Sequence, residues 1–193
     1  MKFRAGDLSQ IALFAALTAV GAFIRIPLPI VPFTLQTFFV SLAGILLGAK
    51  KGMLSQLLYV CIGLLGVPVF TKGGGIGYVF QPTFGYLIGF IVSAYVIGLC
   101  VEHMKKINTV KVYIVAIAGL IIVYLAGVPY LYLLTNIYLG NAMPIGKAFY
   151  YGFVLSIGGD LLSLYLASLV AVKLLPILRK SGLIPEREIN GSR

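Results

Sequence analysis

The sequence predicts an all-α protein, a bundle of six transmembrane helices with both termini in the cytoplasm and a ligand pocket in the outer half. Composition is the first reason: of 193 residues, 60% are hydrophobic and 10% are charged, and the mean hydropathy is +1.04. Soluble domains carry about 25% charged residues. The other two reasons are the lengths of the apolar runs and the distribution of the basic residues.

Each apolar run approaches the ~20 residues that a helix needs to cross the hydrocarbon layer. The predicted spans are residues 8–25, 33–49, 52–70, 84–102, 112–135 and 148–175. Residues 1–193 are thus expected to form one integral membrane domain, and residues 71–83 to form an external lid loop. A cleavable signal peptide is not expected at the start, because the first apolar run extends over about 18 residues to Arg25.

Twelve of the fifteen basic residues fall on one side of this six-span arrangement: Lys2, Arg4, Lys50, Lys51, Lys105, Lys106, Lys111, Lys173, Arg179, Lys180, Arg187 and Arg193. The other side holds Arg25, Lys72 and Lys147. Because basic residues accumulate in cytoplasmic connections, this distribution predicts cytoplasmic termini and an external lid. It also argues against a nucleic-acid partner, since no basic face remains once the spans are removed.

The first span carries small residues on one helical face, at Ala12, Ala15, Ala16 and Ala19. Such a face lets another helix approach closely. The face either packs inside the bundle or docks onto another protein. The same spacing occurs in the second and fourth spans, where packing inside the bundle is preferred, at Gly44 and Gly48 and at Gly85 and Gly89.

Each span that runs outward meets proline near its outer end. The prolines are Pro27, Pro29 and Pro32, then Pro68, then Pro129. Proline removes a backbone donor and disfavours helix before it. Irregular backbone at membrane depth is tolerated where it lines a cavity. We therefore expect a hollow outer half and a closely packed inner half.

The segment at 71–83 has the composition of a lid over that hollow. Gly73, Gly74, Gly75 and Gly77 give it conformational freedom. Aromatic side chains of the lid and of the start of the next span offer flat apolar surfaces that can cover a small molecule: Tyr78, Phe80, Phe84 and Tyr86.

Asp160 is the candidate centre of the site. The other acidic residues, Asp7, Glu102, Glu186 and Glu188, lie at or beyond the predicted cytoplasmic ends, whereas Asp160 lies inside the last span. A carboxylate at that depth is costly and is a functional candidate by default. The alternative is a structural ion pair with Arg25, Lys72 or Lys147. We favour a ligand role, because Gly158 and Gly159 are expected to open space beside the carboxylate.

Further polar groups are predicted at the same depth: Thr34, Gln36 and Asn136. The sequence contains no P-loop for ATP and no complete dinucleotide motif. One histidine and one membrane carboxylate cannot supply a catalytic set or a metal site. We therefore expect a binding or transport protein and not an enzyme, with no cofactor of its own.

Several motifs give the chain a family resemblance. They are residues 32–38 (PFTLQTF), Gly48-x-x-x-Gly52, residues 59–70, the glycine-rich lid, residues 82–90 (PTFGYLIGF) and residues 159–161 (GDL). With these motifs the chain resembles the biotin-specific S component of energy-coupling-factor (ECF) transporters, the BioY family. The resemblance implies a biotin-binding subunit in a prokaryotic cell membrane, a transmembrane coupling protein (T component) and two cytosolic ATPases. It also implies that the alanine face of the first span docks onto the coupling protein.

For the site, the resemblance implies that Asp160 accepts an N–H from the ureido ring of biotin and that Asn136 or Gln36 binds its carbonyl. Many family members carry Lys three positions after this Asp, whereas this chain has Ser163. The expected partners of the biotin carboxylate are therefore Lys72, Arg25, Lys147 or backbone N–H groups of residues 73–77. A self-sufficient ion-driven carrier for a small vitamin is the alternative function, followed by a membrane enzyme.

Overall fold

The structure is a computed structural model that describes residues 4–182. Its α-helices are α1 (Ala5–Phe23), α2 (Gln36–Leu47), α3 (Ala49–Leu64), α4 (Phe84–Glu102), α5 (Thr109–Leu133), α6 (Ile145–Phe149) and α7 (Leu155–Lys180). A 3₁₀-helix, η1 (Ile76–Phe80), and two π-helical turns, η2 (Leu134–Tyr138) and η3 (Tyr150–Val154), complete the helical structure. Five charged residues of the sequence argument lie outside the described residues: Lys2, Glu186, Arg187, Glu188 and Arg193.

The described residues contain four helical stretches that are long and apolar enough to cross a membrane. They are Ala5–Phe23, Phe84–Glu102, Thr109–Tyr138 and Ile145–Lys180, and they correspond to predicted spans 8–25, 84–102, 112–135 and 148–175. The two other predicted spans contain shorter helices, the 12 residues of α2 and the 16 residues of α3. The mostly helical fold is therefore confirmed, and the count of six crossings stays a prediction.

Local sequence explains why α2 and α3 are short. Part of the predicted span 33–49 is extended, because β2 (Phe33–Thr34) pairs antiparallel with β1 (Arg25–Ile26). Gly48, with φ +81°, then allows an abrupt turn between α2 and α3 that a residue with a side chain adopts only rarely. At its other end α3 stops at Leu64, shortly before Pro68.

Pro129 does not interrupt its helix, contrary to the expectation of broken backbone there. It lies inside α5, which continues to Leu133. A proline removes only one donor from the helical ladder, and α5 packs along α4, its most extensive neighbour in the fold. The irregular backbone appears a turn later, in the π-helical turn η2.

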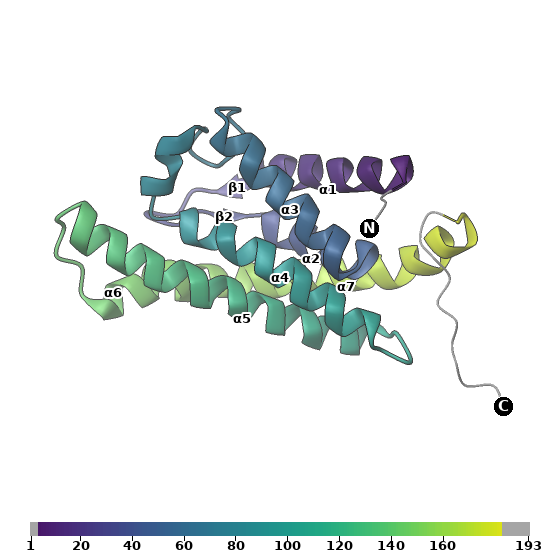
Figure 1. Cartoon of the computed structure of the whole chain (residues 1–193). Helices are drawn as coiled ribbons and strands as arrows, with labels where there is room; N and C mark the ends of the chain where they lie inside the picture. Colours follow the sequence, from purple (N-terminus) through teal and green to yellow (C-terminus); the bar gives the residue numbers. More distant parts are fainter. Residues whose placement is uncertain (1–3, 183–193) are drawn as a thin grey trace.

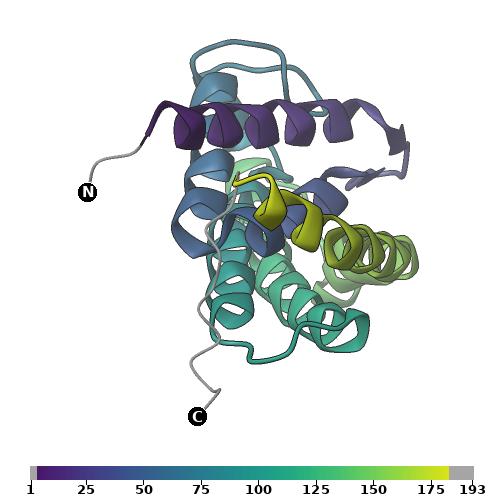
Figure 2. The ribbon, with the colours of Figure 1, turned by 90° about the vertical axis from the view of Figure 1, so that its right-hand side faces the viewer.

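Helix α4 is central to the bundle and contacts α2, α3 and α5. Glycines allow the close approach: a Cβ atom on Gly44 would lie 2.7 Å from the carbonyl oxygen of Ala94, and one on Gly89 would lie 2.8 Å from Cα of Val123. The prediction that these small residues pack inside the bundle is therefore confirmed. Figure 2 shows α1 lying across one side of the bundle, while α7 is seen nearly end-on.

The two ends of the bundle differ in character. At one end, on the left of Figure 1, lie the segment between α3 and α4 and the connection between α5 and α6. At the other end α1 begins and α7 ends, the Asp7 carboxylate pairs with Lys51 at 2.8 Å, and Oε1 of Glu102 accepts the Ala49 N–H at 2.8 Å. Both described chain ends thus share one end of the bundle. Its assignment to the cytoplasm rests on the charge pattern.

Candidate functional site

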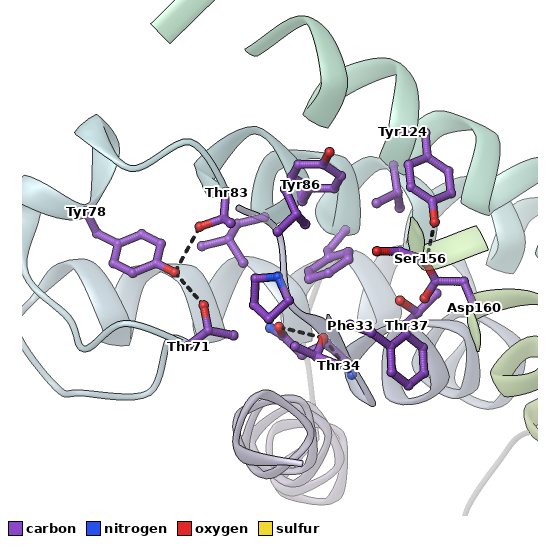
Figure 3. Close-up of a pocket in the computed structure, with 16 residues that line it drawn as sticks. Phe33, Thr34, Thr37, Thr71, Tyr78, Thr83, Tyr86, Tyr124, Ser156 and Asp160 are labelled. Atoms are coloured by element: carbon purple, nitrogen blue, oxygen red, sulfur yellow. Dashed lines mark hydrogen bonds between the residues drawn. The ribbon is translucent and has the colours of Figure 1, made fainter. Parts of the chain in front are cut away.

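A cavity lies near the left-hand end of the bundle in Figure 1 and encloses about 550 Å³, including the space at its mouth. The walls come from the β1–β2 segment, the start of α2, the lid, the start of α4, α5 and α7. Figure 3 shows Tyr78, Thr71 and Thr83 at one end and Asp160, Ser156 and Tyr124 at the other, with Thr34 and Tyr86 between them.

Asp160 forms one end of the cavity, as the sequence predicts. Its carboxylate is 7% exposed and accepts hydrogen bonds from the hydroxyls of Tyr124 and Thr37. The Ser156 hydroxyl lies one turn earlier on the same helix, is buried, lines the cavity and has no hydrogen-bond partner among the described residues. This end of the cavity therefore presents a carboxylate acceptor beside an unused hydroxyl donor.

Asp160 does not form the structural ion pair that was the alternative to a ligand role, so that alternative is wrong. Among the described residues the ion pair is Asp7 with Lys51, at the opposite end of the bundle. Arg25 instead donates to the backbone carbonyl of Thr71, and Lys72 and Lys147 are exposed. A buried carboxylate held by two hydroxyls and left without a cation is available to a ligand that donates hydrogen bonds.

Gly159 does open space beside Asp160, and an aromatic ring fills that space. A Cβ atom on Gly159 would lie 2.6 Å from the ring of Phe33, which lines the cavity. Gly158 points elsewhere, since nothing lies within 4 Å of its Cβ position. The expected role of the Gly-Gly pair therefore belongs to Gly159 alone.

Aromatic and aliphatic side chains also line the cavity, among them Phe33, Tyr86 and Phe90. Tyr86 is buried, and its ring meets that of Tyr124 edge to face at 6.3 Å. Its hydroxyl donates to the carbonyl of Gly152 at 2.8 Å and is therefore occupied. Tyr86 offers a ring face to the cavity, as expected, and its polar end ties α4 to the π-helical turn η3.

Thr34 and Gln36 line the cavity, but most of their hydrogen-bonding groups are already used in contacts with each other and with Tyr59. The Thr34 hydroxyl donates to Oε1 of Gln36 at 3.1 Å, and Nε2 of Gln36 donates to the Tyr59 hydroxyl at 2.8 Å. Tyr59 donates in turn to the Val69 carbonyl at 3.1 Å. These residues hold the start of α2 against the lid more than they offer free groups to a ligand.

The lid is folded and does not behave as an open loop. Phe70, 1% exposed, packs against the rings of Tyr59 and Tyr78 at 5.4 and 4.4 Å. The Tyr78 hydroxyl lies 3.0 Å from Oγ1 of Thr71 and 3.1 Å from Oγ1 of Thr83. These three hydroxyls form the cavity end opposite Asp160 (Figure 3).

Several predicted contacts do not line the cavity. Asn136 is used to close the α5–α6 connection: its side-chain amide donates to the carbonyls of Tyr132 and Met143 at 2.9 and 3.1 Å, and its oxygen accepts the Met143 N–H at 2.9 Å. Phe80 faces outward and stacks on Tyr138 at 4.6 Å. The remaining residues are not among the cavity walls and shape the lid instead: Lys72, Gly73, Gly74, Gly75 and Gly77.

Tyr124, Ser156, Thr37, Thr71 and Thr83 were not predicted as part of the site, and Tyr78 was expected to contribute a flat apolar surface and not a hydroxyl. Ser156 had a usable signal, because a residue four positions before Asp160 lies on the same helical face. Tyr124 had none, since the chain contains 12 tyrosines and hydropathy does not say which one meets the carboxylate. Its position depends on how α4, α5 and α7 pack together.

The alanine face of α1 is divided by the structure. Ala15 is 3% exposed and Ala19 packs against the core, whereas Ala12 and Ala16 are exposed. The two readings of this face therefore apply to different residues. Ala15 and Ala19 serve internal packing, and Ala12 and Ala16 remain free for a partner.

The sequence is similar to those of a known protein family. The sequence profile of the BioY family matches residues 1–180. A Lysinibacillus sphaericus protein named probable biotin transporter BioY is 53% identical over 179 residues, covering 92% of this chain and 91% of the relative. The biotin transporter BioY of Thermotoga maritima is 44% identical over 169 residues, covering 87% and 95%.

A solved structure is also similar: the crystal structure of the S-component for biotin from an ECF-type ABC transporter. It superposes with a TM-score of 0.75 at 26% sequence identity, covering 87% of this chain and 89% of that one. These relatives are transporters by name, which agrees with the prediction that the chain is not an enzyme.

Proposed function

The chain belongs to the BioY family, and from this premise we propose that it is the biotin-binding S component of an ECF-type ABC importer. It captures biotin in the cavity beneath the lid and delivers it through partner subunits. The observation that carries the proposal is the buried Asp160 carboxylate, which faces the cavity beside the buried Ser156 hydroxyl. Within residues 4–182 no cation pairs with this carboxylate and no group forms a hydrogen bond with this hydroxyl.

The chemistry of biotin fits this arrangement. Its ureido ring has two N–H donors and one carbonyl acceptor on adjacent atoms. Asp160 can accept an N–H in addition to its bonds from Tyr124 and Thr37, and Ser156 is free to donate to the carbonyl, so that the Ser156 hydroxyl gains a partner when the ligand is bound. Phe33, Tyr86 and Phe90 supply the apolar surface for the rings and the aliphatic chain.

The membrane arrangement completes the proposal. The chain is a membrane protein of the prokaryotic cell membrane that crosses it six times, with α2 and α3 as short spans and with the lid outside. This topology is supported by the positive-inside distribution of basic residues. Biotin then enters from the lid side.

Transport requires partners, because the sequence contains no P-loop. We propose that a transmembrane T component binds the chain and that two cytosolic ATPases supply the energy. The exposed Ala12 and Ala16 on α1 are the proposed contact with the T component, since small residues let a second helix approach closely.

Binding of labelled biotin to the purified chain tests the function. Asp160→Asn should weaken binding by about 10–100-fold, because a hydrogen bond to a charged group contributes about 1.5–3 kcal/mol. Asp7→Asn, which alters the ion-paired carboxylate at the other end of the bundle, is the matched control and should leave the Kd unchanged. Wild-type affinity in Asp160→Asn would refute the assignment.

Vesicle uptake separates the proposal from the ion-driven carrier. The chain alone should bind biotin and should accumulate none in ATP-free vesicles. Accumulation driven by a proton or sodium gradient would establish the carrier instead.

A further inference from the structure

The cavity end under the lid carries three hydroxyl groups, those of Thr71, Tyr78 and Thr83. Tyr78 is 4% exposed and Thr83 is 7% exposed, so both are shielded from solvent. The Tyr78 oxygen lies within hydrogen-bond distance of both threonine oxygens, at 3.0 and 3.1 Å. Three hydroxyls have three protons, and two internal bonds use two of them. One O–H donor is therefore left for a ligand.

No lysine or arginine is among the residues that line the cavity in the described part of the chain, where Asp160 is the acidic residue of the lining. Lys72 lies in the lid and Arg25 contacts it at Thr71, but both side chains are exposed. The Arg25 guanidinium also donates to the backbone carbonyl of Thr71. The end of a ligand that is remote from Asp160 meets neutral hydroxyls (Figure 3).

We propose that this hydroxyl cluster, defined as Thr71, Tyr78 and Thr83, recognises the ligand's tail as a hydrogen-bond acceptor irrespective of its charge. The site therefore accepts ureido-ring compounds whose tails end in an uncharged amide or ester as well as biotin itself. This inference rests on the proposed function, since it takes the ureido ring to lie at Asp160.

The physical basis is a balance of two effects. A carboxylate makes a stronger hydrogen bond to a hydroxyl than a neutral carbonyl does. Its transfer out of water costs more, however, when no cation is present to compensate. A hydroxyl also accepts hydrogen bonds, so it can pair with the NH₂ of an amide, which a lysine cannot do.

Equilibrium binding of three probes to the full chain tests the inference: biotin, biotinamide and biotin methyl ester. We expect the Kd values of the two neutral compounds to lie within about tenfold of that of biotin, because loss of a charge-assisted pair would cost more than this. Kd values more than tenfold above that of biotin for both neutral compounds would overturn the inference. If the wild type bound none of the three, the proposed function would fail with it, whereas binding of biotin alone refutes only the present inference.

Variants identify the recognising groups. Tyr78→Phe, and independently Thr83→Val, should weaken the binding of both biotin and biotinamide by about fivefold or more, since each variant removes a hydroxyl from the cluster. Tyr113→Phe removes a tyrosine hydroxyl on α5 outside the cavity walls and should change neither Kd. Equal thermal unfolding of the variants confirms that they fold.

The cation alternative gives the opposite pattern. If Lys72 or Arg25 binds the carboxylate of biotin, then Lys72→Gln or Arg25→Gln should raise the Kd for biotin at least tenfold and leave the Kd for biotinamide unchanged. The hydroxyl cluster predicts that neither variant changes the ratio of the two Kd values. A changed ratio in either variant, or full affinity in Tyr78→Phe, would contradict the proposal.

Discussion

The two polar residues at one end of the cavity differ in how many of their hydrogen bonds are already made. Asp160 already accepts from Tyr124 and Thr37, while Ser156 has no partner among the described residues. A buried unpaired hydroxyl costs free energy in the unliganded protein. The ligand removes that cost when it accepts a hydrogen bond from the Ser156 hydroxyl. Ser156 therefore raises the affinity for the ligand and lowers the stability of the unliganded protein.

Ser156→Ala separates these two effects. We expect the Kd for biotin to rise about three- to tenfold, and the unliganded variant to unfold at the same or a higher temperature, because the variant lacks the unpaired group. Ser163→Ala is the matched control, since Ser163 lies on the same helix, is equally buried at 4%, and does not line the cavity. Titration calorimetry and thermal unfolding provide the two readouts, and an unchanged Kd in Ser156→Ala would contradict the role given to it.

At the scale of elements, the cavity depends on how closely α4 approaches α5. Glycines set this distance, since Gly89 lies against Val123 and Gly85 lies against Tyr130. Tyr86 lies between these two glycines on α4, and Tyr124 lies next to Val123 on α5. The two cavity walls are therefore fixed by backbone contact at the glycines.

Gly89→Ala should lower the free energy of unfolding by about 1–3 kcal/mol, because the added methyl group has no room against Val123 and separates the two helices. Biotin binding should weaken as well, since the same contact sets the cavity walls. Gly158→Ala on α7 provides the control, with nothing within 4 Å of its Cβ position. Equal stability of the two variants in denaturant or heat would show that α4 and α5 are not held at this distance.

At the scale of the whole molecule, α1 has two roles on two faces. Ala15 and Ala19 hold it against the bundle, as the packing of α1 on α2 and α3 requires. Ala12 and Ala16 face outward, and large apolar side chains accompany them on the exposed surface, among them Leu8 and Leu13. The helix is therefore expected to connect the binding unit to its partner.

Tryptophan substitution distinguishes the faces. Ala12→Trp and Ala16→Trp should retain biotin binding and reduce uptake by the assembled transporter at least tenfold, because a bulky side chain prevents close helix approach. Ala15→Trp should instead destabilise the chain itself, since Ala15 is 3% exposed. Ala118→Trp, at an exposed site on α5, serves as the control. Undiminished uptake in both Ala12→Trp and Ala16→Trp would move the partner contact elsewhere.

The sequence by itself determined the helical membrane character, the special position of Asp160, the lid and the family. Each of these follows from local or one-dimensional properties: hydropathy over a window, the cost of a charge at membrane depth, glycine content and contiguous motifs. Tyr86, Thr34 and Gln36 were found in the same way, because they stand next to the lid and at the start of a span.

Only the tertiary structure decided which polar groups face the ligand. Asn136 was as plausible as Tyr124 in the sequence, yet one closes a connection and the other reaches Asp160. The division of the alanine face and the neutral hydroxyl cluster likewise depend on the rotation of each helix about its axis. That rotation is set by contacts between residues far apart in the chain, such as Gly89 with Val123, and no local pattern of residues encodes it.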